Sequence, residues 1–73
     1  MVDGAKLRRL RLARTLTMRE LADRSGVNHA AISQIERGKR APHPSTIRKL
    51  ATALEVDPGA LLLDVEEEGK EAA

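Results

Sequence analysis

Apolar residues recur every three or four positions along most of this chain, the spacing expected of helices that bury one face. Leu7 and Leu10 show it near the start, and Ile47, Leu50 and Leu54 show it further on. Nowhere does the pattern alternate with the period of two that a half-buried strand needs. We therefore predict an all-α fold of five helices, over about residues 4–14, 17–25 and 29–37, then around 47–54 and 58–63.

Residues 17–38 carry the clearest boundary signals. Thr17 and Glu20 have the spacing of a capping box, in which each side chain satisfies a backbone amide of the other residue. Gly26 marks a tight turn, where we expect a positive φ and a clash for any Cβ. Gly38 stands where a helix commonly ends. The segment is therefore predicted to form two short helices joined by a glycine turn.

The second helix of this pair has two contrasting faces. Asn28 can cap its first turn through a side-chain oxygen. Ile32 and Ile35 lie three residues apart and so share its buried face. The opposite face carries small or polar side chains, as expected of a surface that meets base edges in a DNA groove: His29, Ala30 and Ser33.

Prolines set the later boundaries. Two of them exclude helix from residues 39–44, so His43 or Ser45 is expected to precede the next helix. Asp57 and Pro58 mark one further start, with Asp57 as the N-cap and Pro58 at the first helical position.

The formal net charge of +2 averages two oppositely charged parts. Residues 1–50 contain twelve Lys and Arg against four Asp and Glu, whereas residues 51–73 contain one Lys against seven acids. The first part should attract a polyanion, unless it is only a solvated basic face. The acidic end has too little apolar content to pack. We therefore expect a helix-turn-helix domain over residues 1–65 and a disordered tail over residues 66–73.

Composition narrows the classes of function. The chain has 73 residues, enough for one domain, and its lack of cysteine excludes disulfides and thiolate metal sites. Phe, Tyr and Trp are absent, which argues against RNA-binding modules that stack bases on aromatic rings. No apolar run suits a membrane span and no signal-peptide pattern opens the chain, so we expect a cytoplasmic protein. No motif suggests an enzyme, a metal or a cofactor.

Several spaced motifs together resemble the Cro/lambda-repressor (XRE) type of helix-turn-helix domain. In chain order, these motifs are Leu7-Arg8-x-Leu10-Arg11, Leu16-Thr17-x-x-Glu20-Leu21-Ala22, Ile32-Ser33-x-Ile35-Glu36-Arg37-Gly38, and the set Pro44, Leu50, Ala51, Leu54 and Val56. The likeness covers roughly residues 7–62. It implies a compact five-helix bundle that binds double-stranded DNA with its third helix, about residues 28–37, in the major groove.

The resemblance also implies roles for individual residues. Five match positions that meet base edges: Asn28, His29, Ala30, Ser33 and Gln34. Five match positions that face phosphates, the last through nearby amides: Thr17, Arg19, Lys39, Arg40 and Ser45. Two match an ion pair between the first and third helices: Arg11 and Glu36.

Simpler roles stay open for some of these residues. His29 could contact a phosphate or only solvent, and Gln34 could contact a phosphate or the backbone. Lys39 and Arg40 could belong to an unengaged basic loop. Two further arginines are expected to add only to the general field: Arg14 and Arg24.

Met18 departs from the pattern of the family. Glutamine is common at this position, where its amide binds a phosphate and braces the third helix. A thioether cannot do this, so either Arg19 supplies the contact or the domain docks at a different angle.

Proteins of this kind usually bind palindromic operators as two-fold dimers. The chain is more apolar near its end than one terminal helix needs, so we expect a homodimer through some of Leu61, Leu62, Leu63 and Val65. The alternative is that Leu61 and Leu62 only close the monomer core.

We therefore expect a sequence-specific DNA-binding transcriptional regulator, and a repressor because nothing suggests an activation surface. Two alternatives remain. One is an antitoxin or a restriction-operon controller of the same fold. The other is a protein-interaction domain without DNA binding, against which the dense positive charge argues.

Overall fold

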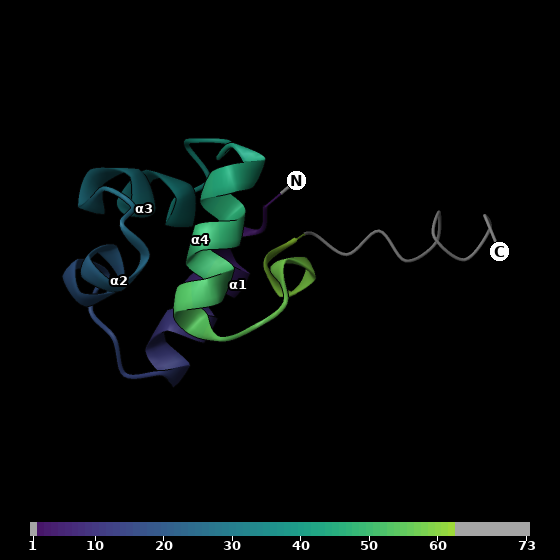
Figure 1. Cartoon of the computed structure of the whole chain (residues 1–73). Coiled ribbons are helices and arrows are strands. Elements are labelled where there is room, and N and C mark those ends of the chain that lie inside the picture. The colour runs from purple at the N-terminus through teal and green to yellow at the C-terminus, as the bar shows by residue number, and fades with distance from the viewer. Residues whose placement is uncertain (1, 63–73) are drawn as a thin grey trace, which may run out of the picture.

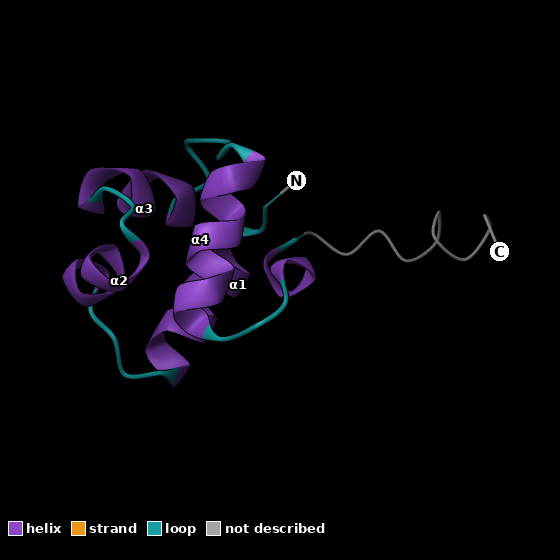
Figure 2. Cartoon of the chain, viewed as in Figure 1, coloured by secondary structure: helices purple, strands orange, loops and turns teal. Residues whose placement is uncertain are grey.

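The computed structural model describes residues 2–62. Its elements are α1 (Gly4–Ala13), α2 (Met18–Ser25), α3 (His29–Glu36), α4 (Pro44–Leu54) and a short 3-10 helix, η1 (Pro58–Leu61). In Figure 1, α4 crosses in front of α1, and α2 and α3 lie together on the left. The described residues contain only helices and loops (Figure 2), apart from one isolated bridge between Val2 and Leu62. The all-α prediction is confirmed, whereas the tail predicted over residues 66–73 lies outside the described residues.

The predicted fifth helix is instead the four-residue η1. Asp57 stands at the N-cap position, but its side chain makes no capping hydrogen bond, contrary to the prediction. Pro58 and Gly59 are poor helix formers and make up half of the element. Leu62 is already extended, with φ −92° and ψ 155°, so the helix ends before residue 63. The described residues therefore form four α-helices and one 3-10 helix, and the predicted count of five helices is not confirmed.

The core is wholly aliphatic, and each helix contributes to it. Leu7, Leu21, Ile32, Leu54 and Leu61 come from the five different elements, and none of them has any exposed surface. Burying one such side chain contributes about 1.5–3 kcal/mol. Because α2 packs on both α3 and α4, this core holds the two helices of the predicted pair in one orientation.

Three helices end in the same backbone motif. After α3, Gly38 has φ +74° and its amide donates to the carbonyl of Ile35 at 3.0 Å. The next amide reaches the carbonyl five residues back, which completes a Schellman motif. After α1 and α4 the corresponding residues are Thr15 and Glu55, with φ +54° and +61°. These two residues hold a backbone conformation that favours glycine.

Close backbone packing occurs at Gly4 and not at Gly26. Gly26 has the predicted positive φ, +75°, but a Cβ added there would meet no atom within 4 Å. The expected clash was therefore wrong, and the turn needs glycine only for its backbone conformation. At Gly4 an added Cβ would collide with the carbonyl oxygens of Ile35 and Glu36. The first turn of α1 thus lies directly against the last turn of α3.

The two ends of the described chain are joined. Val2 and Leu62 form an antiparallel bridge, and the amide of Asp3 donates to the carbonyl of Leu61 at 2.8 Å. Asp3 also caps α1, because its side chain accepts from two amides of the first turn. The chain therefore leaves η1 beside its own beginning.

Arg14 joins the other end of α1 to α4. Its Nε donates to the carbonyl of Leu54 at 2.8 Å. We expected Arg14 to add only to the electrostatic field. This expectation was incomplete, because Arg14 also binds the carbonyl of a residue forty positions away in sequence.

No helix within residues 2–62 is long and apolar enough to cross a bilayer.

Candidate nucleic-acid interface

The predicted capping box begins α2. The hydroxyl oxygen of Thr17 accepts from the amide of Glu20 at 3.0 Å, and the carboxylate of Glu20 accepts from the amide of Thr17 at 2.8 Å. These contacts with Thr17 hold the pKa of Glu20 below its ordinary value, so the carboxylate stays charged. Since the Thr17 oxygen acts here as an acceptor, its hydroxyl hydrogen can still be donated outward.

The turn after α2 sets the direction of α3. The amide of buried Val27 donates to the hydroxyl oxygen of Ser25 at 3.1 Å. Asn28 caps α3, because its side-chain oxygen accepts from the amide of Ala30 at 2.7 Å. The cap uses the side-chain oxygen of Asn28 and leaves its NH₂ group to donate to a ligand.

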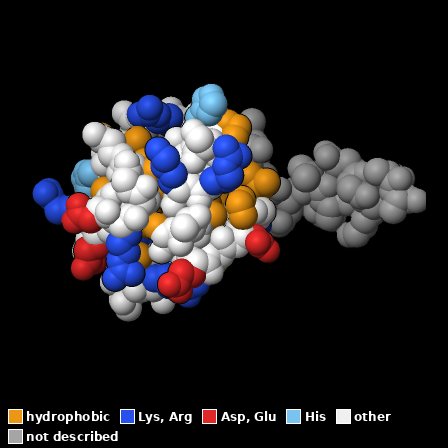
Figure 3. Space-filling model, viewed as in Figure 1, with side chains coloured by type: hydrophobic (Ala, Val, Ile, Leu, Met, Phe, Trp, Pro, Cys, Tyr) orange, Lys and Arg blue, Asp and Glu red, His pale blue; other side chains and the backbone are white. Residues whose placement is uncertain are grey.

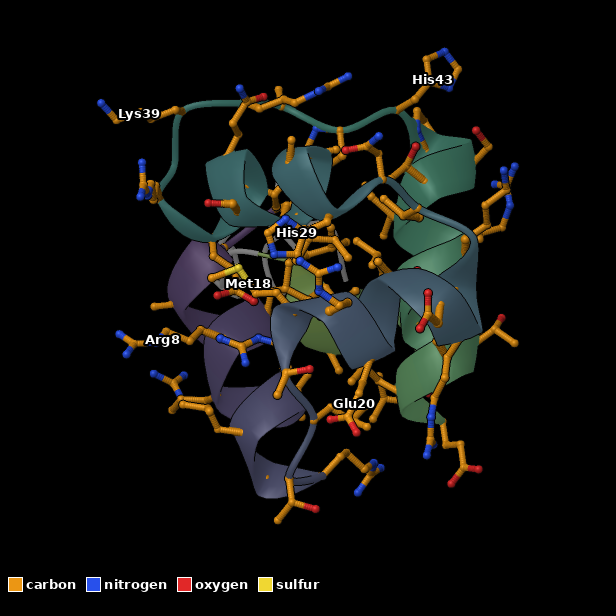
Figure 4. All side chains as sticks on the ribbon, turned by 90° about the vertical axis from the view of Figure 1, so that its left-hand side faces the viewer. Arg8, Met18, Glu20, His29, Lys39 and His43 are labelled. Atoms are coloured by element: carbon orange, nitrogen blue, oxygen red, sulfur yellow. The ribbon has the colours of Figure 1, made fainter. Side chains whose placement is uncertain are left out.

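The outward face of α3 is a short stripe of small and polar side chains. His29, Ala30 and Gln34 are exposed and Ser33 is half-buried, while three apolar residues cover the inner face: Ala31, Ile32 and Ile35. Figure 4 looks onto this face, with His29 near its centre, Met18 beside it and Lys39 at the upper edge. The structure thus brings the predicted base-facing residues together on one surface.

Gln34 is tied to the loop that follows α3. Its side-chain oxygen accepts from Nη1 of Arg40 at 3.2 Å, and both side chains are exposed. A bidentate contact of Gln34 with adenine needs this oxygen as an acceptor. This oxygen has two lone pairs, so it can keep the contact with Arg40 and still accept from a base; the sequence did not indicate the contact with Arg40.

Met18 packs inward and Arg19 does not. Met18 is half-buried against the apolar core, while Arg19 is exposed at the start of α2. The thioether thus extends the core under the surface that carries His29 (Figure 4). Arg19 is the neighbouring cation at the position where the family pattern has a phosphate contact.

Arg11 and Glu36 hold α1 against the end of α3. Nε and Nη2 of Arg11 donate to the two carboxylate oxygens of Glu36 at 2.6 and 3.0 Å, and the side chains are 8% and 3% exposed. Nη1 of Arg11 donates to the carbonyl of Leu16 at 2.9 Å. Hydrogen bonding to Glu36 raises the pKa of Arg11, so the guanidinium is charged at any ordinary pH. The pair lies away from solvent and acts by positioning α3.

The loop between α3 and α4 and the start of α4 form a basic rim. Lys39 and Arg40 are exposed in the loop, and Ser45 is exposed in the first turn of α4. The helix begins after His43 with no side-chain cap. Pro44 has no amide hydrogen and the amides of Thr46 and Ile47 donate to the carbonyl of His43, which leaves the amide of Ser45 for an anion. Figure 3 shows Lys and Arg side chains, but no acidic ones, over the upper part of that view, where this loop and the start of α4 lie.

A hollow of about 430 Å³ lies between the glycine turn and this loop, and Asn28, Arg40 and Lys49 are among the residues that line it. Within residues 2–62, no three His, Asp or Glu side chains lie close enough together to hold a metal ion. The predicted phosphate-facing residues form two groups, Thr17 with Arg19 and the basic rim. In Figure 4 the labelled Met18, which follows Thr17 and precedes Arg19, lies beside His29, and Lys39 of the basic rim lies at the upper edge of the same view.

The Helix-turn-helix family model matches residues 7–61 of this chain. The chain belongs to the Cro/C1-type (XRE) helix-turn-helix family. A curated relative, the HTH-type transcriptional repressor RghR of Bacillus subtilis, is 56% identical over 54 residues, which is 73% of this chain and 40% of the relative. The chain thus spans about two fifths of the length of the first curated relatives that it matches.

Two solved structures are similar to most of this chain. The restriction-modification controller protein C.AhdI from Aeromonas hydrophila is 41% identical with a TM-score of 0.78, and the match covers 81% of this chain and 89% of the controller. The P22 c2 repressor, in complex with a synthetic operator, is 31% identical with a TM-score of 0.77, and the match covers 85% and 94%.

Proposed function

We propose that this chain is the DNA-binding part of a transcriptional repressor that acts on nucleoid DNA in the cytoplasm, with α3 in the major groove of its operator. The observation that carries the proposal is the outward stripe of α3, which has short side chains and hydrogen-bond donors, together with the exposed cations of α2 and of the loop after α3: Arg19, Lys39 and Arg40. An α-helix fits the major groove, where each base pair presents a distinct set of donors and acceptors. The repressors RghR and P22 c2 support the same assignment by their similarity.

Base reading is assigned to the exposed end of α3. His29 can donate to N7 or O6 of guanine, Ala30 can contact a thymine methyl group, and Ser33 can donate or accept with little discrimination. The free NH₂ group of Asn28 adds a donor at the edge of the stripe. Gln34 can contact a base while its side-chain oxygen keeps the contact with Arg40, because that oxygen has two lone pairs.

Phosphate contacts are assigned to the two flanking groups. The free hydroxyl hydrogen of Thr17 and the exposed guanidinium of Arg19 face one strand, which gives Arg19 the role that Met18 cannot fill. Lys39 and Arg40, with the amides near Ser45, face the other. Such contacts set the register on DNA and the affinity without reading sequence.

We further propose that the chain acts as a homodimer on a palindromic operator. One module of this size buries about 600–1,000 Å² against DNA, which rarely gives strong specificity alone. Of the four residues expected to supply the seam, we leave out Leu61, because it is fully buried in the monomer core. Half-buried Leu62 stays available, and two other predicted seam residues lie outside the described part: Leu63 and Val65.

A restriction-operon controller is the second candidate function. The similarity to C.AhdI favours it, because the match covers most of both chains. Such a controller would bind the same kind of operator, so the chemistry of α3 does not separate the two functions. The genes next to the operator would separate a repressor from a restriction-operon controller, because an adjacent endonuclease gene would support the controller.

Selection of bound sites from random duplex DNA tests the proposal directly. We expect an enriched palindrome whose half-sites lie about 34 Å apart, one helical turn. Affinity should fall steeply as salt rises, because bound phosphates release their counterions. No affinity for any duplex at low salt would overturn DNA binding and favour a protein-interaction domain. Enrichment of a single half-site with a monomeric complex would overturn only the dimer.

A further inference from the structure

A shallow basic hollow of about 290 Å³ lies where the beginning of the chain meets the loop after α3. Val2, Ile35, Gly38 and residues 39–42 line it, and two of these residues are the exposed cations Lys39 and Arg40. Val2 is also the residue that forms the antiparallel bridge with Leu62. The last described residue, Leu62, therefore pairs directly with a residue that lines this hollow.

The sequence after this point is strongly acidic. Residues 64–68 read Asp-Val-Glu-Glu-Glu and carry four negative charges with no positive one. Val2 both lines the hollow and pairs with Leu62, so this acidic sequence is attached at the border of the hollow. An extended chain covers about 3.3 Å per residue, so these acids can reach about 7–20 Å from Leu62.

We propose that the acidic segment 64–68 of this chain docks on the hollow at Lys39 and Arg40 and competes there with DNA phosphate. The argument rests on charge complementarity and on the place where the segment is attached. Exposed ion pairs are individually weak. A short tether raises the effective concentration of the segment to about the millimolar range, so weak pairs suffice.

The consequence is a built-in restraint on nonspecific binding, and it rests on the proposed DNA-binding function. Nonspecific affinity comes almost entirely from phosphate contacts, whereas an operator adds base contacts on α3. A segment that covers two phosphate-binding cations lowers both affinities by the same factor. Nonspecific complexes form with lower affinity, so at a given protein concentration they are the first to be lost.

A pair of matched triple variants tests the docking. The first removes three charges from the segment, with Glu66→Gln, Glu67→Gln and Glu68→Gln. The second removes three charges from exposed sites on the folded body, with Asp23→Asn, Glu55→Gln and Asp57→Asn. Both raise the net charge equally, so they separate docking from long-range electrostatics.

Affinity for a random duplex at low salt is the first measurement. We expect the segment variant to bind about three- to tenfold more tightly than the parent chain and the body variant less than about twofold. In a Lys39→Ala, Arg40→Ala background the gain from the segment variant should disappear. Equal gains in the two triple variants, or a gain that persists in the alanine background, would overturn the proposal.

Amide NMR spectra without DNA give a readout that does not depend on the proposed function. The segment variant should shift the amide signals of Val2 and of residues 38–41, and the body variant should not. If these shifts appear but no variant binds duplex, the docking stands and the DNA-binding function fails. Absent shifts, or shifts that depend on protein concentration, would overturn docking within one chain.

Discussion

Both carboxylate oxygens of Glu36 accept hydrogen bonds from Arg11, at 2.6 and 3.0 Å, across the junction of α1 and α3. The third donor group of the same guanidinium binds the carbonyl of Leu16, just before α2. One buried side chain therefore links α1 to both helices of the helix-turn-helix. This arrangement fixes the end of α3 while leaving its outward face free.

Glu36→Gln should lower the free energy of unfolding by about 3 kcal/mol, because it leaves the buried charge of Arg11 without a counterion. Urea denaturation at neutral pH measures the change. Arg37→Gln is the matched control, since Arg37 is the next residue and is exposed. A loss below about 1 kcal/mol for Glu36→Gln would show that the pair does not hold the junction.

Gly4→Ala should destabilise the fold by about 1–3 kcal/mol, because its Cβ would collide with backbone carbonyls of α3 that cannot move without shifting the helix. Gly59→Ala is the control, since a Cβ there meets no atom within 4 Å. We expect that control to change stability by about 0.5 kcal/mol or less. Equal effects of the two substitutions in thermal unfolding would contradict close packing at Gly4.

Thr15→Gly should stabilise the protein by about 0.5–1 kcal/mol, because a β-branched residue there holds φ +54°. The reverse experiment is Gly26→Ala, which should cost about 1 kcal/mol through backbone conformation alone. A much larger cost at Gly26 would reveal a steric contact that the open space around it does not contain. In urea denaturation, the midpoint of Thr15→Gly should lie above that of the parent chain and the midpoint of Gly26→Ala below it.

Acid should weaken the start of α2 through Glu20. Its pKa is lower in the folded state than the ordinary value of 4.5, chiefly because it accepts from the backbone of Thr17. The resulting stabilisation is fully present above about pH 4.5 and is lost as the pH falls through the lower folded-state pKa. The free energies of unfolding of the parent chain and of Glu20→Gln should therefore differ at pH 6 and converge as the pH falls below the lowered folded-state pKa. A difference in stability that does not change with pH would show that the charge of Glu20 is not its cause.

His29→Ala and Lys39→Ala should affect DNA binding in different ways. His29→Ala should change the preferred base at one operator position, because the side chain lies on the outward face of α3 (Figure 4). Lys39→Ala should weaken binding to all sequences and lower the salt slope by about one. Competition binding against a library of single-base operator variants separates the two results. Uniform loss of affinity in both variants would refute the assignment of base reading.

Local signals predicted much of the interface. The capping box at Thr17, the cap at Asn28 and the positive φ at Gly26 involve residues within three positions of one another, so spacing alone indicates them. Hydrophobic periodicity placed Ile32 on the buried face of α3 for the same reason. The prediction of a fifth helix to about residue 63 was not confirmed. A short segment with Pro58 and Gly59 carries too little hydrophobic periodicity to distinguish an α-helix from a 3-10 helix.

Contacts between distant residues depended on tertiary structure. Hydrophobic pattern, caps and charge determined by themselves that the chain is helical, where α2 and α3 lie and which face of α3 is polar, because these properties follow from neighbours in sequence. Packing decided that Gly4 lies against α3, that Arg14 binds the carbonyl of Leu54, and that Leu62 pairs with Val2. No local pattern carries these contacts, since each depends on how helices far apart in the chain fill one aliphatic core.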